Sequence, residues 1–351
     1  MAVKGRFDNV EWTKWAEDIR LRWKWAMDYY REELYYDIEF QQYMQFKFHE
    51  QWMKLKAYAN ENGIKIIGDI PIYVAMDSAD TWAHPELFQL DEENVPTAVA
   101  GCPPDGFSAT GQLWGNPLFR WDVMREDGYS WWTMRLRKMS TLYDVIRIDH
   151  FRGFDSYYAI PGKDTTARNG VWRNGPGMEL FRAVEEKLGK LDIIVEDLGF
   201  LTPSVLQLVA DSGYPGMKVV QFAFDSRDDS DYMPHNYDKH CVVYTGTHDN
   251  DTILGWMKQA PKNSVKKAKE YLRMTKEEGY NWGMMCGAWM SSANLAVVTM
   301  QDLIGLGSSA RMNIPSTLGG NWTWRALPGQ INAPLANKLH HKTELYGRLR
   351  R

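Results

Sequence analysis

Short hydrophobic runs alternate with longer amphipathic stretches along most of the chain after residue 63. Six of these runs are rich in β-branched or other apolar residues, and nearly all of them end in polar or charged residues. Runs of this length without an alternating polar face are typical of strands buried on both sides, as in a parallel sheet. We therefore predict strands at 64–73, 145–149, 193–197, 217–224, 241–245 and 295–300.

The stretches between these runs have the three- and four-residue apolar spacing of helices. Helices are expected near 130–142, 177–188, 203–210, 264–278 and 282–294. This strand–helix order predicts an α/β protein with a parallel sheet. Polar residues at the ends of nearly all the strands favour a (β/α)8 barrel of the TIM type, because a doubly wound sheet concentrates its chemistry at one switch point. Residues 305–310 match a dinucleotide-binding glycine pattern but lack the acidic residue about 20 positions later, so we interpret them as a loop.

The same pattern divides the chain into three regions. Residues 1–63 are predicted to be a helical region that ends at Gly63, and 331–351 a C-terminal helix. Residues 64–330 would form the barrel, with a loop-rich insertion at 75–122. One apolar stripe at helical spacing runs through the first region, made of Phe40, Tyr43, Met44, Phe48, Trp52 and Leu55.

Composition narrows the class of protein. The net charge of the 351 residues is −4 without a basic stripe, which argues against nucleic acid as the partner. No apolar run approaches the ~20 residues of a membrane span, and charged residues from Lys4 onward argue against a signal peptide. The three cysteines lack CxxC spacing, which indicates reduced thiols in a cytoplasmic protein.

Three of the predicted strands lead into carboxylates, at Asp149, Glu196 and Asp249. Acids brought to one mouth suit glycoside chemistry, in which an acid and a nucleophile flank one bond. Arg147 and Asp149 point to the same side of their strand, and an adjacent guanidinium favours an ionised carboxylate. A glutamate in an apolar mouth has its pKa raised by desolvation, so Glu196 can act as a general acid. The alternatives are a purely structural Arg–Asp pair and a buried structural glutamate.

A metal site and a sugar platform are two further hypotheses. His150 and His248 could be metal ligands, but the chain has neither HxH nor HExxH, so we expect no metal and no cofactor. Tryptophans in segments rich in Gly, Asn and Pro either stack on sugar faces or plug the barrel mouth. These are Trp114, Trp172, Trp322 and Trp324.

Several longer motifs are more specific than the scattered acids. They are GDIPIYV at 68–74, a Gly- and Pro-rich run at 101–117, RIDHFRGF at 147–154, EDLG at 196–199, THDNDT at 247–252 and ARMN at 310–313. With these motifs, the chain resembles the 4-α-glucanotransferases (amylomaltases, or disproportionating enzymes) of glycoside hydrolase family 77 from about residue 30 to its end.

The resemblance implies a role for each matched residue. Asp149 would be the nucleophile, Glu196 the acid/base, and Asp249 the carboxylate that holds sugar hydroxyls at the cleaved subsite. The implied reaction moves α-1,4-glucan segments between maltooligosaccharides, without a cofactor and with retention of configuration. Substrate contacts are implied for Asp69, Phe107, Ser108, Gln112, Trp114, Asn116, Arg147, His150 and His248.

Two departures from the family pattern give further expectations. Gly106 stands where many members carry a larger residue, which leaves the glucan contact there open. Members also have two strand–helix units ahead of the region that matches residues 1–60, so we expect an N-terminally truncated barrel of six strands. Strands 64–73 and 295–300 would then have open edges, and we expect poor solubility and weak activity. The alternatives in function are an inactive or glucan-binding fragment, an α-glucan hydrolase, and a metal-dependent barrel hydrolase.

Overall fold

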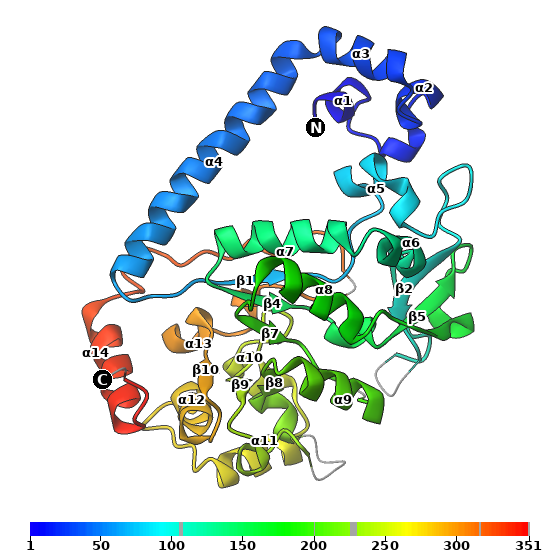
Figure 1. Ribbon diagram of the computed structural model, residues 1–351. Helices are drawn as coiled ribbons and strands as arrows, with labels where there is room; N and C mark the ends of the chain where they lie inside the picture. The colour runs from blue at the N-terminus through cyan, green and yellow to red at the C-terminus, as the bar shows by residue number, and fades with distance from the viewer. Residues whose placement is uncertain (105–107, 200, 225–229, 316, 350–351) are drawn as a thin grey trace. The chain divides into compact units, whose positions relative to one another are not determined.

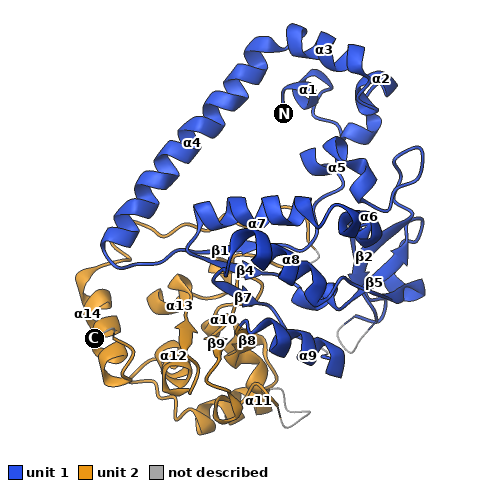
Figure 2. Ribbon diagram, in the orientation of Figure 1, with its two compact units in different colours: residues 1–214 blue, residues 215–351 orange. Residues whose placement is uncertain are grey.

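The computed structural model describes residues 1–104, 108–199, 201–224, 230–315 and 317–349. The chain divides into two compact units, residues 1–214 and 215–351, which Figure 2 distinguishes by colour. The described helices include none long and apolar enough to cross a membrane.

The first unit contains a parallel three-stranded sheet in the order β1-β4-β7. Its strands are β1 (Ile67–Ile70), β4 (Val145–Ile148) and β7 (Ile193–Val195). Their apolar side chains share one core with residues of three helices, α7 (Ser130–Leu142), α8 (Met178–Leu188) and α9 (Pro203–Ser212). Figure 1 shows α7 and α8 alongside this sheet. The predicted strands and helices of this part are confirmed, with strand ends shortened by one to three residues.

The second unit contains a parallel sheet in the order β10-β9-β8. Its strands are β8 (Gly216–Val219), β9 (Cys241–Tyr244) and β10 (Leu295–Val297). The helices are α10 (Ile253–Gln259), α11 (Lys262–Tyr271), α12 (Tyr280–Met290), α13 (Met300–Ile304) and α14 (Ala333–Leu345). All three strands were predicted, but each was predicted one to five residues too long at its carboxyl end, most of all 217–224, where Val220–Phe224 forms a 3-10 turn. There the Gln221 side chain donates a hydrogen bond to the backbone oxygen of Asp251 over 2.8 Å. The helix predicted at 264–278 ends already at Tyr271.

The loop-rich interpretation of residues 75–122 missed two strands, and the loop predicted after Asp149 was wrong. These stretches build an antiparallel four-stranded sheet in the order β3-β2-β5-β6. Gly101 shows why the pattern was missed, since a Cβ there would lie only 2.1 Å from the backbone oxygen of Gln112 on the neighbouring strand. A glycine, which the sequence pattern associates with loops, is therefore required where these two strands pair closely. The strands are β2 (Ala98–Cys102), β3 (Gln112–Pro117), β5 (Ser156–Pro161) and β6 (Val171–Asn174), with the short helices α5 (Ala79–Ala83) and α6 (Trp121–Glu126) nearby in sequence.

The N-terminal region is helical, as predicted. Figure 1 shows a long helix, α4 (Tyr35–Glu61), between the small helices α1 (Ala2–Arg6), α2 (Glu17–Arg20) and α3 (Lys24–Glu33) and the sheet of the first unit. The helix ends before Gly63, which has the left-handed φ of 73°. Trp52 anchors it by donating from its indole Nε1 to the carbonyl of Leu142 over 2.9 Å.

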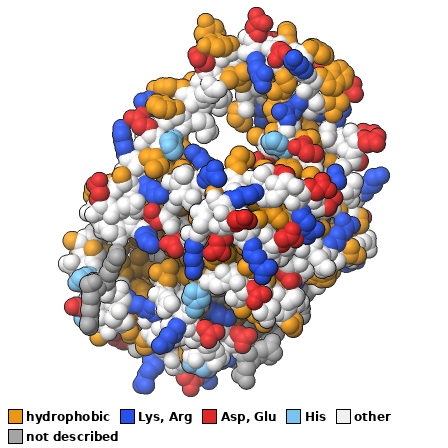
Figure 3. All heavy atoms as spheres, in the orientation of Figure 1, with side chains coloured by type: hydrophobic (Ala, Val, Ile, Leu, Met, Phe, Trp, Pro, Cys, Tyr) orange, Lys and Arg blue, Asp and Glu red, His pale blue; other side chains and the backbone are white. Residues whose placement is uncertain are grey.

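The apolar stripe of α4 does not pack into a core. No residue of this helix is buried, and Phe40, Tyr43, Met44, Phe48 and Leu55 are all exposed. Hydrophobic side chains are visible over this helical region in Figure 3. Within the described residues, β1 and β10 are end strands of their sheets, as expected, but β7 and β8 are end strands as well, which the prediction did not include. The predicted poor solubility stays a prediction that these exposed groups motivate.

Candidate active site

In the first unit, a buried arginine joins two carboxylates at the ends of adjacent strands. Asp69 on β1 lies opposite Arg147 on β4 in the parallel register. Arg147 Nη1 contacts Asp69 Oδ1 and Oδ2 at 2.6 and 2.8 Å, and Asp149 Oδ1 at 2.9 Å. The Arg147 side chain is 8% exposed. Burial alone would lower its pKa, but Asp69 and Asp149 outweigh that effect and the pKa is raised, so the guanidinium stays charged.

Glu196 follows β7 and lies beside this group. Its Oε2 accepts a hydrogen bond from the backbone N–H of His150 at 2.8 Å, and its Oε1 accepts one from Leu198 at 2.7 Å. Burial and the neighbouring Asp149 carboxylate raise its pKa to about 7, although Arg147 and the two N–H groups act in the opposite direction. The predicted desolvated acid is therefore confirmed in its environment, and a good fraction of it is protonated near neutral pH.

Rings surround His150, the residue after Asp149. Burial lowers the pKa of His150 to about 4 although Asp149 acts to raise it, so the imidazole is neutral at pH 7. The Trp114 ring meets it edge-on with centroids 4.8 Å apart, and the Tyr73 ring lies 6.4 Å from both. Tyr73 was not among the predicted site residues, although it belongs to the matched run 68–74. His150 itself has a left-handed φ of 52°, a strained conformation of the kind that clusters at functional sites.

In the second unit, Asp249 follows β9, and its carboxylate is held by a neutral amide while a guanidinium contacts its backbone. Asn313 Nδ2 donates to Asp249 Oδ1 over 2.6 Å, and Arg311 Nη2 donates to the backbone oxygen of Asp249 over 2.6 Å. His248 Nε2 lies 3.4 Å from Asp249 Oδ2, and the His248 ring lies 5.0 Å from that of Trp322. Sequence reasoning gave no role to Arg311 or Asn313. Their only signal was membership of the ARMN motif.

Other predicted contact residues form hydrogen bonds with partners both near and far along the chain. Asn116 Nδ2 donates to the carbonyl of Val74 over 2.9 Å, and Trp114 Nε1 donates to Gln112 Oε1 over 3.1 Å. Ser108 Oγ donates to the carbonyl of Gly111 over 2.7 Å. Phe107 and Gly106 lie outside the described residues. The structure thus brings together one set in the first unit, namely Asp69, Trp114, Arg147, Asp149, His150 and Glu196, and a second set in the other unit, namely His248 and Asp249.

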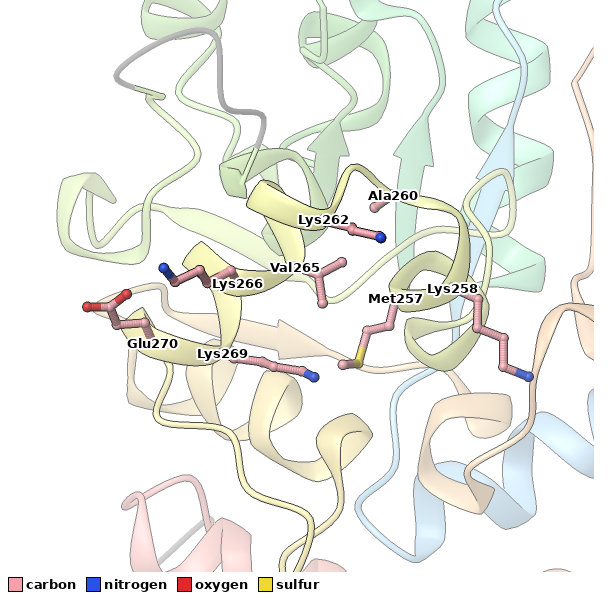
Figure 4. Close-up of a pocket in the computed structure, with 8 residues that line it drawn as sticks. All are labelled: Met257, Lys258, Ala260, Lys262, Val265, Lys266, Lys269 and Glu270. Atoms are coloured by element: carbon pink, nitrogen blue, oxygen red, sulfur yellow. The ribbon is translucent and has the colours of Figure 1, made fainter.

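Two further observations concern alternative sites. Among the described residues, no group of three or more His, Cys, Asp or Glu side chains has an arrangement that could hold a metal ion. Figure 4 shows a surface hollow of about 660 Å³ on α10 and α11, lined by residues that include Lys258, Lys262, Lys266 and Lys269. None of the predicted site residues lines it.

Comparison with known proteins identifies the family. A family model described as glycoside hydrolase 77, 4-alpha-glucanotransferase, matches residues 1–330. A 4-alpha-glucanotransferase of Clostridium butyricum is 48% identical over 99% of this chain and 72% of its own length. One of Streptococcus pneumoniae is 49% identical over 99% of this chain and 70% of its own length. The structure of an amylomaltase from Streptococcus agalactiae in complex with acarbose is similar with a TM-score of 0.97 and 40% identity, over 100% of this chain and 71% of that one.

These matches define a protein of the (β/α)-barrel class with a carbohydrate-active site, which confirms the predicted fold class. The chain belongs to the 4-alpha-glucanotransferase family, glycoside hydrolase family 77. It spans about 70% of the length of the first relatives named, 72% for the Clostridium butyricum protein and 70% for that of Streptococcus pneumoniae.

Proposed function

We propose that this chain is a 4-α-glucanotransferase that moves α-1,4-glucan segments from a donor to an acceptor maltooligosaccharide or glucose by a retaining mechanism. Acarbose, bound in the structure of the Streptococcus agalactiae relative, is itself an oligosaccharide mimic and supports a maltooligosaccharide substrate. The observation that carries the proposal is that Asp149 is paired with Arg147 and lies beside Glu196, a partly buried carboxyl whose pKa is about 7. One group is suited to attack and the other to donate a proton.

In the first step, an Asp149 carboxylate oxygen forms a bond to the anomeric carbon of the donor. The glycosidic C–O bond breaks, and the leaving oxygen takes the proton of Glu196. Arg147 stabilises the ionised nucleophile in the free enzyme. The product of this step is a glycosyl ester on Asp149 and a shortened glucan that can leave.

In the second step, the 4-hydroxyl of an acceptor attacks the anomeric carbon. Ionised Glu196 takes the hydroxyl proton, the ester bond breaks, and Asp149 is regenerated. Two displacements retain the α configuration. We assign Asp249 and His248 to hydrogen bonds with sugar hydroxyls of the substrate, and neutral His150 to a further hydrogen bond with the substrate. The mechanism needs no cofactor.

We place this activity in the cytoplasm. No two of the three cysteines form a disulfide within the described residues. A reducing compartment fits such thiols.

Incubation of the purified chain with maltotriose tests the function. We expect glucose together with longer oligosaccharides, measured by chromatography, because transfer moves maltosyl or glucosyl units between chains. Products limited to glucose and maltose would indicate an α-glucan hydrolase, and binding of acarbose without turnover would indicate an inactive glucan-binding fragment. Activity that disappears with EDTA and returns with a divalent metal would favour the metal-dependent hydrolase.

Asp149→Asn tests the nucleophile. We expect loss of transfer by on the order of 10⁴-fold without a change in the thermal midpoint, since the nearly isosteric amide cannot form the glycosyl ester. The matched control is Asp192→Asn at the opposite end of β7, where Asp192 forms an exposed ion pair with Lys65 at 3.3 Å. Transfer by Asp149→Asn at the control's rate would contradict the assignment.

A further inference from the structure

The His248–Asp249 segment is fixed by contacts with residues more than 60 positions later. Arg311 uses two nitrogens: Nη2 donates to the backbone oxygen of Asp249 over 2.6 Å, and Nε donates to the backbone oxygen of Asn313 over 2.9 Å. One guanidinium therefore ties the two loop segments together. Arg311 contacts only the backbone of Asp249 here, so it sets the place of the residue rather than the direction of its carboxylate.

Asn313 lies against the same dipeptide with both its backbone and its side chain. Its N–H donates to the backbone oxygen of His248 over 3.0 Å, and its Nδ2 donates to Asp249 Oδ1 over 2.6 Å. The second contact fixes the side chain of Asp249, because one carboxylate oxygen is held while the other, Oδ2, stays on the His248 side at 3.4 Å from Nε2. A neutral donor does this without adding a charge that would compete for the carboxylate.

We propose that Asn313 is a positioning residue for Asp249: its amide sets the rotamer of the carboxylate so that Oδ2 is presented to the sugar, while Arg311 fixes the backbone beneath it. The proposal rests on the proposed function, since Asp249 is the residue that would hold sugar hydroxyls. An amide that donates to one oxygen leaves the second oxygen to accept from a hydroxyl, which is the geometry needed for oriented substrate binding.

The alternative is that Asn313 only anchors a loop. Asn321 offers a matched comparison, because it does anchor the same segment: its Oδ1 accepts from the Ile314 N–H at 3.0 Å and its Nδ2 donates to Thr317 Oγ1 at 3.0 Å. None of these partners is a proposed site residue. A role in loop anchoring alone predicts similar behaviour for equivalent changes at Asn313 and Asn321.

The substitution Asn313→Asp separates the two roles through pH. At pH 7 it places a carboxylate against Asp249 Oδ1, which removes the donor and adds repulsion. At lower pH the two carboxylates share one proton, which restores both the hydrogen bond and the net charge of the native pair. Asn313→Ala removes the donor at every pH.

We expect kcat/KM for maltotriose disproportionation by Asn313→Asp to fall about 10- to 100-fold relative to the native chain at pH 7. The kcat/KM of Asn313→Asp divided by that of the native chain should rise at least about fivefold from pH 7 to pH 5, whereas the same ratio for Asn313→Ala should stay low at both pH values. The kcat/KM of Asn321→Asp should stay within about twofold of that of the native chain at pH 7 and at pH 5. Titration calorimetry with acarbose should give the same pattern without turnover, and thermal unfolding should show that the variants fold.

The outcomes distinguish a failure of the proposed function from a failure of the positioning role. If the native chain neither disproportionates maltotriose nor binds acarbose, the proposed function fails and the positioning role fails with it. If the native chain is active or binds acarbose, the positioning role is overturned by a native-like Asn313→Asp, by a loss that does not depend on pH, or by an equal loss in Asn321→Asp.

Discussion

The acids of the two units are held in opposite ways. In the first unit, Asp69 and Asp149 share one buried guanidinium, and Glu196 lies in a desolvated site beside them. In the second, Asp249 is contacted by a neutral amide and by a guanidinium that reaches only its backbone. A nucleophile and a general acid need opposite protonation states, so charged neighbours and desolvation are what distinguish their two sites. A carboxylate that only binds hydroxyls needs its oxygens to be oriented, and a hydrogen bond from an amide provides that orientation.

This comparison predicts that charge matters most in the first unit and geometry most in the second. Substitutions that keep shape but remove charge or a proton should therefore be severe at Glu196 and Arg147. A substitution that adds charge should be severe at Asn313, as the test above requires. Three further experiments, in order of expected effect, address the contrast.

The largest of these effects is expected for Glu196→Gln. Loss of the proton donor should lower maltotriose turnover on the order of 10³-fold. An α-maltosyl fluoride donor needs no proton on its leaving group, so the first step should be partly rescued and a glycosyl adduct should accumulate, visible by intact-protein mass spectrometry. In the native chain the protonated form is lost as the pH rises through about 7, so activity should fall there. An adduct on any residue other than Asp149, or no adduct, would contradict the division of roles.

A smaller but still large effect is expected for Arg147→Met. The change removes the only charge shown to contact both Asp69 and Asp149 among the described residues. We expect turnover to fall about 100-fold and the free energy of unfolding to fall by about 1.5–3 kcal/mol, the range for hydrogen bonds to charged groups. Asp69→Asn is the matched comparison, since it leaves the Arg147–Asp149 contact, and it should lose much less activity. Equal losses would mean that Asp69 is as important as the guanidinium.

The smallest effect concerns Asp302 of the second unit, whose Oδ1 accepts from the Ile253 N–H at 2.7 Å and whose Oδ2 accepts from Thr245 at 3.3 Å. Burial raises its pKa to about 6. A carboxyl whose pKa is higher in the folded state contributes stability that is complete below its unfolded value near 4 and is lost as the pH rises through about 6. The free energy of unfolding should therefore fall by on the order of 2 kcal/mol across that window.

In Asp302→Asn this dependence should vanish, because the amide does not titrate. Denaturant unfolding between pH 4 and 7 measures it. The pH profile of turnover should keep its fall near pH 7, since Glu196 is unchanged. A shifted activity profile in this variant would show that the second unit also contributes charge to the chemistry, which would break the contrast between the two units.

The sequence by itself determined the parallel strands and the acids at their ends. The short β-branched run 193–195 is buried on both faces, and the residue that follows it lies at the carboxyl end of the strand. This local rule placed Asp149 and Glu196 correctly and predicted the raised pKa of a glutamate in an apolar setting. The two-residue alternation of side chains along a strand also placed Arg147 on the same side as Asp149.

The tertiary structure alone decided the features that depend on how distant segments of the chain meet. The antiparallel sheet contains Gly101. In the sequence this glycine favours a loop, but in the structure the neighbouring strand leaves no room for a side chain there. The stripe on α4 has the spacing of a buried face, yet it is exposed, because spacing tells which residues share a face and not what covers it. The contact of Asn313 with Asp249 spans 64 residues and has no periodic signal, since a hydrogen bond between two loops follows from where the chain brings them and not from any local preference.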